Sequence, residues 1–72
     1  MFVRVINQGK YLITAHASQW VCIRKLPQLV VVGRYFVGGR IVGMDVSYSP
    51  ERDTIIYCGD LSGSNHLLKV KL

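Results

Sequence analysis

Acidic residues are the scarcest charged groups of this sequence: four aspartates and glutamates stand against nine lysines and arginines, which gives a formal net charge of +5. Long apolar runs are missing too, because charged or polar residues interrupt every hydrophobic stretch before the roughly 18 residues that a transmembrane helix needs. The first residues lack the apolar core and the small-residue cleavage site of a secretory signal. We therefore expect a cytoplasmic protein without a membrane partner.

Charged residues are also few in total, at 18% of the chain, while 50% of the residues are hydrophobic. A disordered tail needs the opposite balance, so the composition predicts a folded domain. With 72 residues the chain can form one small domain, residues 1–72. A domain of this size buries only about 60–65% of the surface that it exposes when unfolded, which leaves a single core with limited stability.

The charge is unevenly distributed along the chain. Residues 1–44 contain six basic residues and no acidic one, whereas all four acidic residues lie between Asp45 and Asp60. A basic field of this kind attracts either an acidic protein surface or the phosphates of a nucleic acid. Charge alone does not distinguish these two partners.

Residues that bind metals or form disulfides are isolated from one another. Cys22 and Cys58 are the only cysteines, and no Cys-x-x-Cys step is present, so we predict two buried thiols and no disulfide. His16 and His66 lack a neighbouring ligand at the short spacing that places two ligands on one metal ion. The sequence therefore predicts no metal site.

Catalytic motifs are missing as well. There is no Gly-x-Ser-x-Gly elbow and no paired-carboxylate spacing. The segment from Gly33 to Arg40 has the glycine spacing of a P-loop but lacks the Lys-Ser/Thr that holds phosphate and magnesium, so Gly38 and Gly39 are interpreted as a hairpin turn or a bulge. We predict a protein that is not an enzyme and has no cofactor and no small-molecule substrate.

Alternation of apolar and polar residues with a period of two dominates the chain and is typical of β-strands. The predicted strands are Phe2–Ile6, Tyr11–Ala15, Trp20–Leu26, Leu29–Val37, Ile41–Tyr48, Thr54–Cys58 and His66–Leu72. Gly9 and Pro50 mark turns between them, and residues 61–65 indicate a flexible connector. The fold class is all-β: a small antiparallel barrel or a blade-like sheet of about six to seven short strands.

One segment leaves an alternative open. Ser18 could cap a short helix over residues 19–25, with Val21 and Cys22 on one face and Pro27 at its end.

Two strands divide into an apolar and a polar face. The predicted inner faces are Val42, Met44, Val46 and Tyr48 in one strand and Leu68, Val70 and Leu72 in the other, opposite Ile41, Gly43, Asp45 and Ser47 and opposite Lys69 and Lys71. The segment Leu29–Val32 differs, because it is apolar on both sides. It indicates a central strand or a strand covered by another subunit, and the short chain favours the second, so we expect a homo-oligomer.

The sequence contains a partial internal repeat. Residues 3–7, 10–15 and 20–26 parallel residues 46–50, 53–58 and 67–72, with an offset of 43 that grows to 46 in the last segment. A period of about 40–45 residues with three short strands per unit is typical of propeller blades.

Residues 42–50, which read Val-Gly-Met-Asp-Val-Ser-Tyr-Ser-Pro, followed by residues 54–60 and 68–72, resemble one blade of a WD-repeat propeller. The resemblance implies an inner strand that ends in Ser-Pro, a middle strand before an Asp-containing turn, and a next strand outside it. The Trp-Asp and Gly-His pairs of the family are replaced by Val70-Lys71 and Gly39-Arg40. Because a propeller closes with at least about four blades, the resemblance implies several assembled copies or a fragment.

A second resemblance covers part of the same stretch. Gly39-Arg-Ile-Val-Gly43, followed by residues 55–60, is similar to the two short motifs of Sm-like RNA-binding barrels. It implies a barrel that binds RNA, although Cys58 stands where that family has a cation.

Aromatic and basic side chains interleave in the half of the chain that has no acid, a combination that lets bases stack while cations hold phosphates. Trp20 and Phe36 are predicted to lie in the core, since a small domain can hardly spare its largest apolar side chains. The remaining candidates for binding a polyanion or another partner are Lys10, Tyr11, Arg24, Lys25, Arg34, Tyr35 and Arg40.

These observations favour a non-enzymatic all-β binding module that acts by contact with a macromolecule, a protein in the first place, and that associates with itself. A small basic barrel that binds single-stranded RNA or DNA is one alternative. A phage- or plasmid-type inhibitor of a host enzyme is the other, since it fits the chain length and the edge-strand chemistry equally well.

Overall fold

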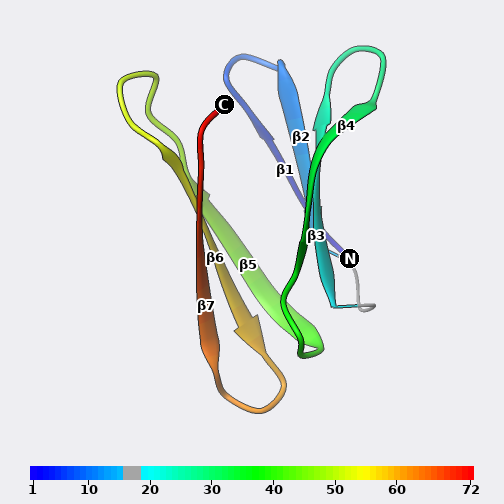
Figure 1. The fold of residues 1–72 in the computed structure, drawn as a ribbon, viewed down its shortest axis with the longest axis vertical. Coiled ribbons are helices and arrows are strands. Elements are labelled where there is room, and N and C mark those ends of the chain that lie inside the picture. Colours follow the sequence, from blue (N-terminus) through cyan, green and yellow to red (C-terminus); the bar gives the residue numbers. More distant parts are fainter. Residues whose placement is uncertain (16–18) are drawn as a thin grey trace.

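The computed structural model describes residues 1–15 and 19–72, and its regular structure is entirely β-strand. The seven strands (Figure 1) are β1 Phe2–Ile6, β2 Tyr11–Ala15, β3 Trp20–Lys25, β4 Val30–Phe36, β5 Ile41–Ser47, β6 Thr54–Asp60 and β7 Asn65–Val70. The predicted all-β fold is confirmed, and every strand lies within two residues of its predicted bounds. The part of the chain that the structure describes contains no helix long and apolar enough to cross a membrane.

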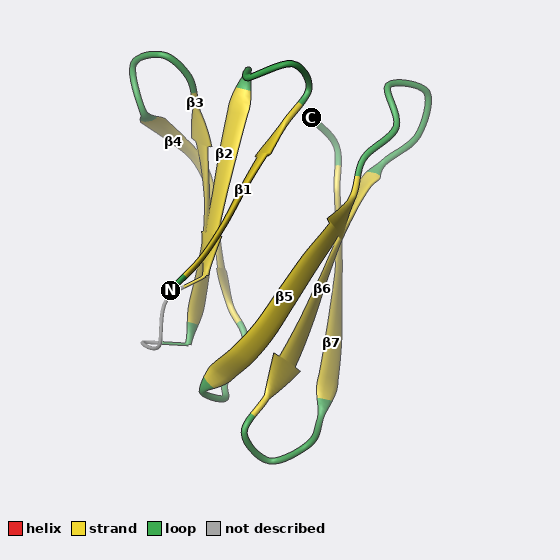
Figure 2. Cartoon of the chain, turned by 180° about the vertical axis from the view of Figure 1, so that it is seen from behind, coloured by secondary structure: helices red, strands yellow, loops and turns green. Residues whose placement is uncertain are grey.

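The strands form two antiparallel sheets in which each strand pairs with the next along the chain. The first sheet has the order β1-β2-β3-β4 and the second the order β5-β6-β7 (Figure 2). The sheets are open and face each other, so the predicted barrel is wrong, and the seven strands are divided between two sheets where the alternative had one blade-like sheet.

The alternative helix at residues 19–25 is wrong, because this segment is strand β3. Its side chains alternate across the first sheet: Val21 and Ile23 are fully buried on the inner side, and Trp20 and Arg24 are only half-buried on the outer side. Backbone pairing with both β2 and β4 fixes this extended form. The proposed cap, Ser18, lies outside the described residues.

The core lies between the two sheets. Ile13, Val21 and Ile23 from the first sheet and Ile56 from the second have no exposed surface. Both free cysteines are buried, as the sequence predicts, and burial raises the pKa of the Cys58 thiol.

A bulge in β5 changes which residues of this strand face the core. Ile41 pairs with Asp60 and Gly43 with Gly59, which leaves Val42 as an extra residue between two pairs. Ile41 is therefore buried while Val42 is 50% exposed. The predicted faces are wrong at these two residues, because the extra residue reverses the alternation.

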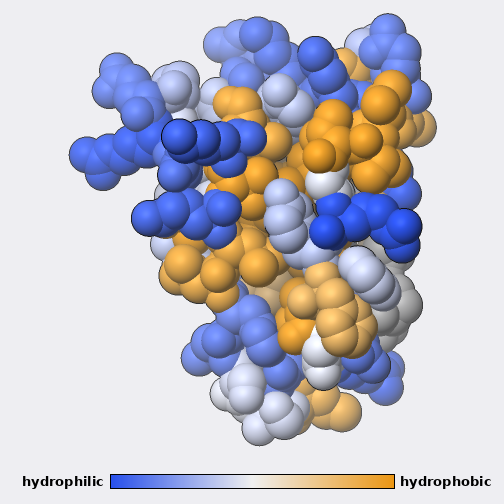
Figure 3. Space-filling model, in the orientation of Figure 1, coloured by the Kyte–Doolittle hydropathy of each residue, from blue (hydrophilic) through white to orange (hydrophobic). Residues whose placement is uncertain are grey.

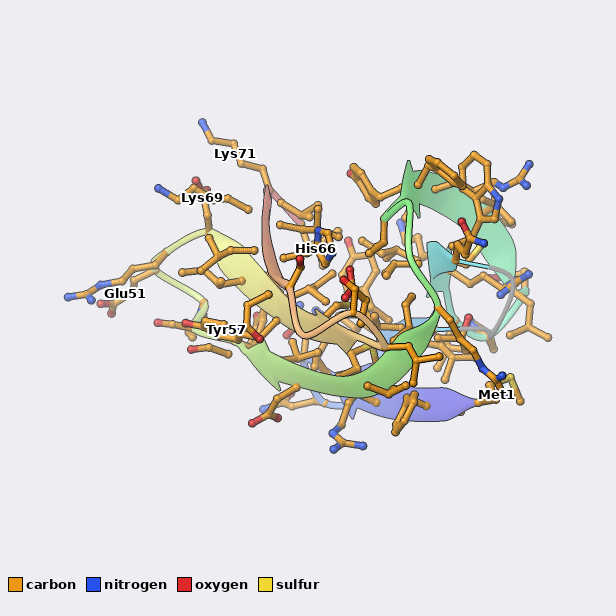
Figure 4. The ribbon with its side chains drawn as sticks, turned by 90° about the horizontal axis from the view of Figure 1, so that it is seen from below. Met1, Glu51, Tyr57, His66, Lys69 and Lys71 are labelled. Carbon is orange, nitrogen blue, oxygen red and sulfur yellow. The ribbon has the colours of Figure 1, made fainter. Side chains whose placement is uncertain are left out.

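The two sheets approach each other most closely at β1 and β5. Figure 4, seen along the strands, shows these two strands beside each other at one edge, while β4 and β7 lie apart at the other. Arg4 of β1 reaches β5, where its Nη2 donates a hydrogen bond of 3.5 Å to the carbonyl oxygen of Met44 and its Nε lies 4.0 Å from Oδ1 of Asp45. The molecule is a wedge with β1 and β5 at its narrow edge.

Candidate protein-binding face

The outer face of the first sheet carries the most unusual surface of the molecule. Cross-strand partners share a face of a sheet, so the pairing of β1 to β4 defines its members. This surface, called the Trp20 face, consists of Val3, Val5, Leu12, Thr14, Trp20, Cys22, Arg24, Val31, Arg34 and Phe36. It contains six large apolar side chains and two arginines, and no acidic residue.

Several of these apolar side chains are exposed to solvent. The exposed fraction is 42% for Val3, 57% for Val5 and 61% for Phe36. Val31 of β4, in the same face, is 46% exposed, and Figure 3 shows hydrophobic atoms gathered over this strand. Exposed apolar side chains that gather on one face make this face a candidate for contact with another molecule.

An aromatic and arginine cluster stands at one end of the Trp20 face. The rings of Trp20 and Phe36 have centroids 5.1 Å apart and are tilted by 55°. The guanidinium carbon of Arg34 lies 4.9 Å from the centroid of the Trp20 ring, in the geometry of a cation–π contact. Neighbours hold all three side chains in place, and tryptophan and arginine are enriched at the energetic centres of interfaces.

Arg24 covers the middle of the same face. Its Nη1 donates a hydrogen bond of 3.4 Å to the hydroxyl oxygen of Thr14. Thr14 and Cys22 are buried although they point away from the core. The face therefore combines exposed apolar side chains with arginines that lie along its surface.

The seven predicted binding residues do not form one site. Arg24 and Arg34 share the Trp20 face. Tyr11, Lys25 and Tyr35 lie on the opposite side of the sheet, where they line a cavity of about 270 Å³. This cavity is also lined by Val70, Lys71 and Leu72 near the end of the chain.

The other two predicted residues lie in connections. Lys10 belongs to the β1–β2 turn, where its carbonyl oxygen accepts a hydrogen bond from the Leu26 amide. Arg40 precedes β5 at the opposite end of the molecule (Figure 1), and its carbonyl oxygen accepts from the Leu61 amide. Both side chains lie outside the Trp20 face.

The prediction that Trp20 and Phe36 belong to the core is wrong, since Trp20 is half-buried and Phe36 is largely exposed. The strand period contains the signal that could have placed them. Trp20 is four residues from Arg24, and Phe36 is two from Arg34, so the strand period puts each aromatic on the face of its arginine.

The outer face of the second sheet has a different shape, which we call the hollow face. A hollow of about 530 Å³ lies over the paired glycines Gly43 and Gly59, with Tyr57 and Leu67 among its lining residues. A Cβ atom added at Gly43 would meet nothing within 4 Å. In Figure 4 Tyr57 and Lys69 lie away from the first sheet, whereas His66 points between the sheets.

The most organised polar cluster surrounds Asp60, at the start of the β6–β7 turn. Its Oδ1 accepts hydrogen bonds from the Ser62 hydroxyl at 2.6 Å and from the Ser62 and Ser64 amides at 3.0 Å each. Its Oδ2 lies 2.7 Å from Nε2 of His66. The His66 contact, followed by the Ser62 hydroxyl, lowers the pKa of Asp60 from 3.8 to about 2.

This cluster builds the turn and does not resemble a catalytic triad. In a triad the histidine contacts the nucleophile, whereas Ser62 and His66 both contact the carboxylate of Asp60. The predicted flexible connector is thus a turn closed by hydrogen bonds. Among the described residues no group of three or more His, Cys, Asp or Glu side chains could hold a metal ion, and His16 lies outside them.

Comparisons with known proteins give no identification. No protein-family model matches the chain, and neither curated proteins nor solved structures provide a significant match.

Proposed function

We propose that this chain is a non-enzymatic binding module that acts by contact with a protein and associates with itself, using the Trp20 face. The observation that carries the proposal is Phe36, a large aromatic side chain that is 61% exposed beside Trp20 and Arg34. Within the chain Phe36 contacts the Trp20 ring, and most of its own surface stays exposed. A partner that covers this surface supplies a reason for its exposure.

The energetics favour a covered face. Full burial of a valine or phenylalanine side chain stabilises by about 1.5–3 kcal/mol relative to the exposed state. Val3, Val5 and Phe36 are only partly buried, so covering them in a complex would add several kilocalories per mole of stabilisation to the isolated chain. Because so small a domain has limited stability of its own, association would raise the stability of the folded chain.

Sedimentation velocity over a wide range of concentrations tests this proposal. The wild-type chain should sediment as a species larger than one chain at high concentration, and Phe36→Lys should shift the equilibrium toward the monomer by at least tenfold. Leu61→Lys is the matched control, because Leu61 is 69% exposed in the β6–β7 turn, outside the Trp20 face. A strict monomer at every concentration overturns the self-association.

A second candidate function is binding of single-stranded nucleic acid. It is favoured by the arrangement of Arg34 over the Trp20 ring, next to the exposed Phe36, since bases stack on aromatic rings and arginines hold phosphates. Binding of this kind weakens steeply as the salt concentration rises, whereas an apolar protein interface changes little.

The structure offers a charge-matched pair of variants to test this candidate by fluorescence anisotropy on oligo-uridine and oligo-thymidine. Arg24→Glu/Arg34→Glu reverses two cations on the Trp20 face, and Lys10→Glu/Arg40→Glu reverses two cations away from it. Loss of binding in the first variant alone supports the candidate. Equal binding by both variants and the wild-type chain contradicts it.

A further inference from the structure

The two sheets are related by a rotation about an axis beside β1 and β5. These strands lie next to each other, and their arrows point the same way in Figure 2. From each of them the following strands step away in sequence order, as β2 to β4 in one sheet and as β6 and β7 in the other. The second sheet therefore repeats the arrangement of β1, β2 and β3, and β4 has no counterpart in it.

This rotation determines which faces correspond. The rotation that carries the second sheet onto the first turns the inner face of the second sheet into the outer face of the first. The inner face of one sheet therefore corresponds to the outer face of the other. The pair Ala15 and Val21 ends the β2–β3 ladder, and the pair Gly59 and Asn65 ends the β6–β7 ladder. On this correspondence the buried Ile23 of the first sheet matches the exposed Leu67 of the second.

The hollow face is thus the counterpart of the buried face of the first sheet, and the Trp20 face is the counterpart of the buried face of the second. Each uncovered outer face thus corresponds to an inner face that is covered within the chain. The two outer faces can therefore pack against each other as the two inner faces do, but only when they belong to two different chains.

We infer that a second copy of this chain covers the Trp20 face with its hollow face, in the geometry of the sheet packing inside one chain. This inference rests on the proposed self-association and names its two surfaces. The aromatic cluster and the hollow lie at the same position along the strand direction. Residues 37–40 join the Phe36 end of β4 to the Ile41 end of β5, so both features lie at the same end of the molecule (Figure 1).

Charge favours this head-to-tail contact over a symmetric one. Two Trp20 faces in contact bring Arg24 and Arg34 of both copies together without an acidic residue, and like charges in an interface are costly. The hollow face instead offers the carboxylate of Asp45, whose side chain is 81% exposed, while its cation Lys69 lies toward the other end of the face, beyond Leu67. Repetition of such a contact gives a ring if the rotation closes, and rings of sheets close with about four to eight sheets, or two to four copies of this chain.

Copies with one blocked face test the inference. Val5→Lys/Phe36→Lys blocks the Trp20 face, and Tyr57→Lys/Leu67→Lys blocks the hollow face at residues that are 43% and 60% exposed. Each variant alone should be a monomer in sedimentation velocity. An equimolar mixture should form a dimer and nothing larger, because each copy keeps one working face. Gln8→Lys/Leu61→Lys adds the same charge in two turns and should behave like the wild-type chain.

The other outcomes separate this inference from the proposed function. If the variant with only the Trp20 face intact dimerises alone, the faces pair with themselves, so the head-to-tail contact is wrong and self-association stands. A mixture that stays monomeric while the wild-type chain associates also overturns the contact. A monomeric wild-type chain overturns both. Circular dichroism checks folding, and the serine variants at the same four positions replace any lysine variant that does not fold.

Discussion

At the scale of single residues, Gly39, in the connection before β5, lies close to Asp60 at the end of β6. A Cβ atom at residue 39 would lie 2.6 Å from Oδ2 and 2.9 Å from Cβ of Asp60. The Asp60 side chain is held by the turn and cannot move aside. We expect Gly39→Ala to destabilise the fold by about 1–3 kcal/mol in urea unfolding. Gly43→Ala, where a Cβ atom meets nothing within 4 Å, should be neutral, and equal effects would contradict the contact.

Asp60 also predicts an acid-dependent part of the stability. Its pKa is lower in the folded chain, at about 2, than its ordinary value of 3.8. The carboxylate therefore stabilises the fold above its unfolded pKa, and this contribution is lost as the pH falls from about 3.8 toward 2. Asp60→Asn should melt at a lower temperature than the wild-type chain at neutral pH, and the difference should narrow through this range. A difference that is constant with pH would contradict the assignment.

The turn around Asp60 was only partly predictable. An aspartate two residues before a serine and three before a glycine is typical of a turn in which the carboxylate binds following amides. The sequence contains this pattern at Asp60, Ser62 and Gly63. The contacts with His66 and Gly39 depend on the pairing of β6 with β7 and on the path of the chain between the sheets, which the pattern does not contain.

At the scale of elements, the strands were predictable because their period of two is strong, and the bulge in β5 was not. A bulge adds a residue without a side-chain signature of its own, and the glycine at residue 43 is its only local sign. The alternative helix at residues 19–25 has a similar cause. Its local capping residues are compatible with a helix, and only the pairing with β2 and β4, which the segment itself does not contain, makes it a strand.

The bulge makes a prediction opposite to simple alternation. Because Ile41 is 4% exposed and Val42 is 50% exposed, Ile41→Ala should destabilise the fold by about 2–4 kcal/mol and Val42→Ala by less than about 1 kcal/mol. Urea unfolding of both variants measures the difference. The reverse order of effects would mean that β5 is a regular strand with Val42 in the core.

At the scale of the whole molecule, the charge and hydrophobic content of the sequence indicated a binding module, but the two uncovered faces could not be located. Their position depends on how the two sheets turn relative to each other about β1 and β5, which is a property of the packing and not of any one segment. The predicted set of aromatic and basic residues is divided between the two sides of the first sheet by strand alternation, and two of its members, Lys10 and Arg40, lie in connections.

If the two uncovered faces pair between copies as proposed, the stability of this chain depends on its concentration. A partner that binds only the folded chain raises its stability by mass action, so a second copy does so as the protein is concentrated. For a dimer each tenfold rise in concentration adds about 0.7 kcal/mol per chain, which raises the melting temperature of so small a domain by roughly 3–6 °C.

We expect the melting temperature of the wild-type chain to rise with concentration and that of a variant carrying all four lysines, Val5→Lys/Phe36→Lys/Tyr57→Lys/Leu67→Lys, to stay constant. Differential scanning calorimetry at several concentrations measures both. The Gln8→Lys/Leu61→Lys control should keep the wild-type slope, because its lysines lie in turns outside both faces. A wild-type melting temperature independent of concentration would mean that these faces remain open in solution, and that the fold is stabilised by its internal sheet packing alone.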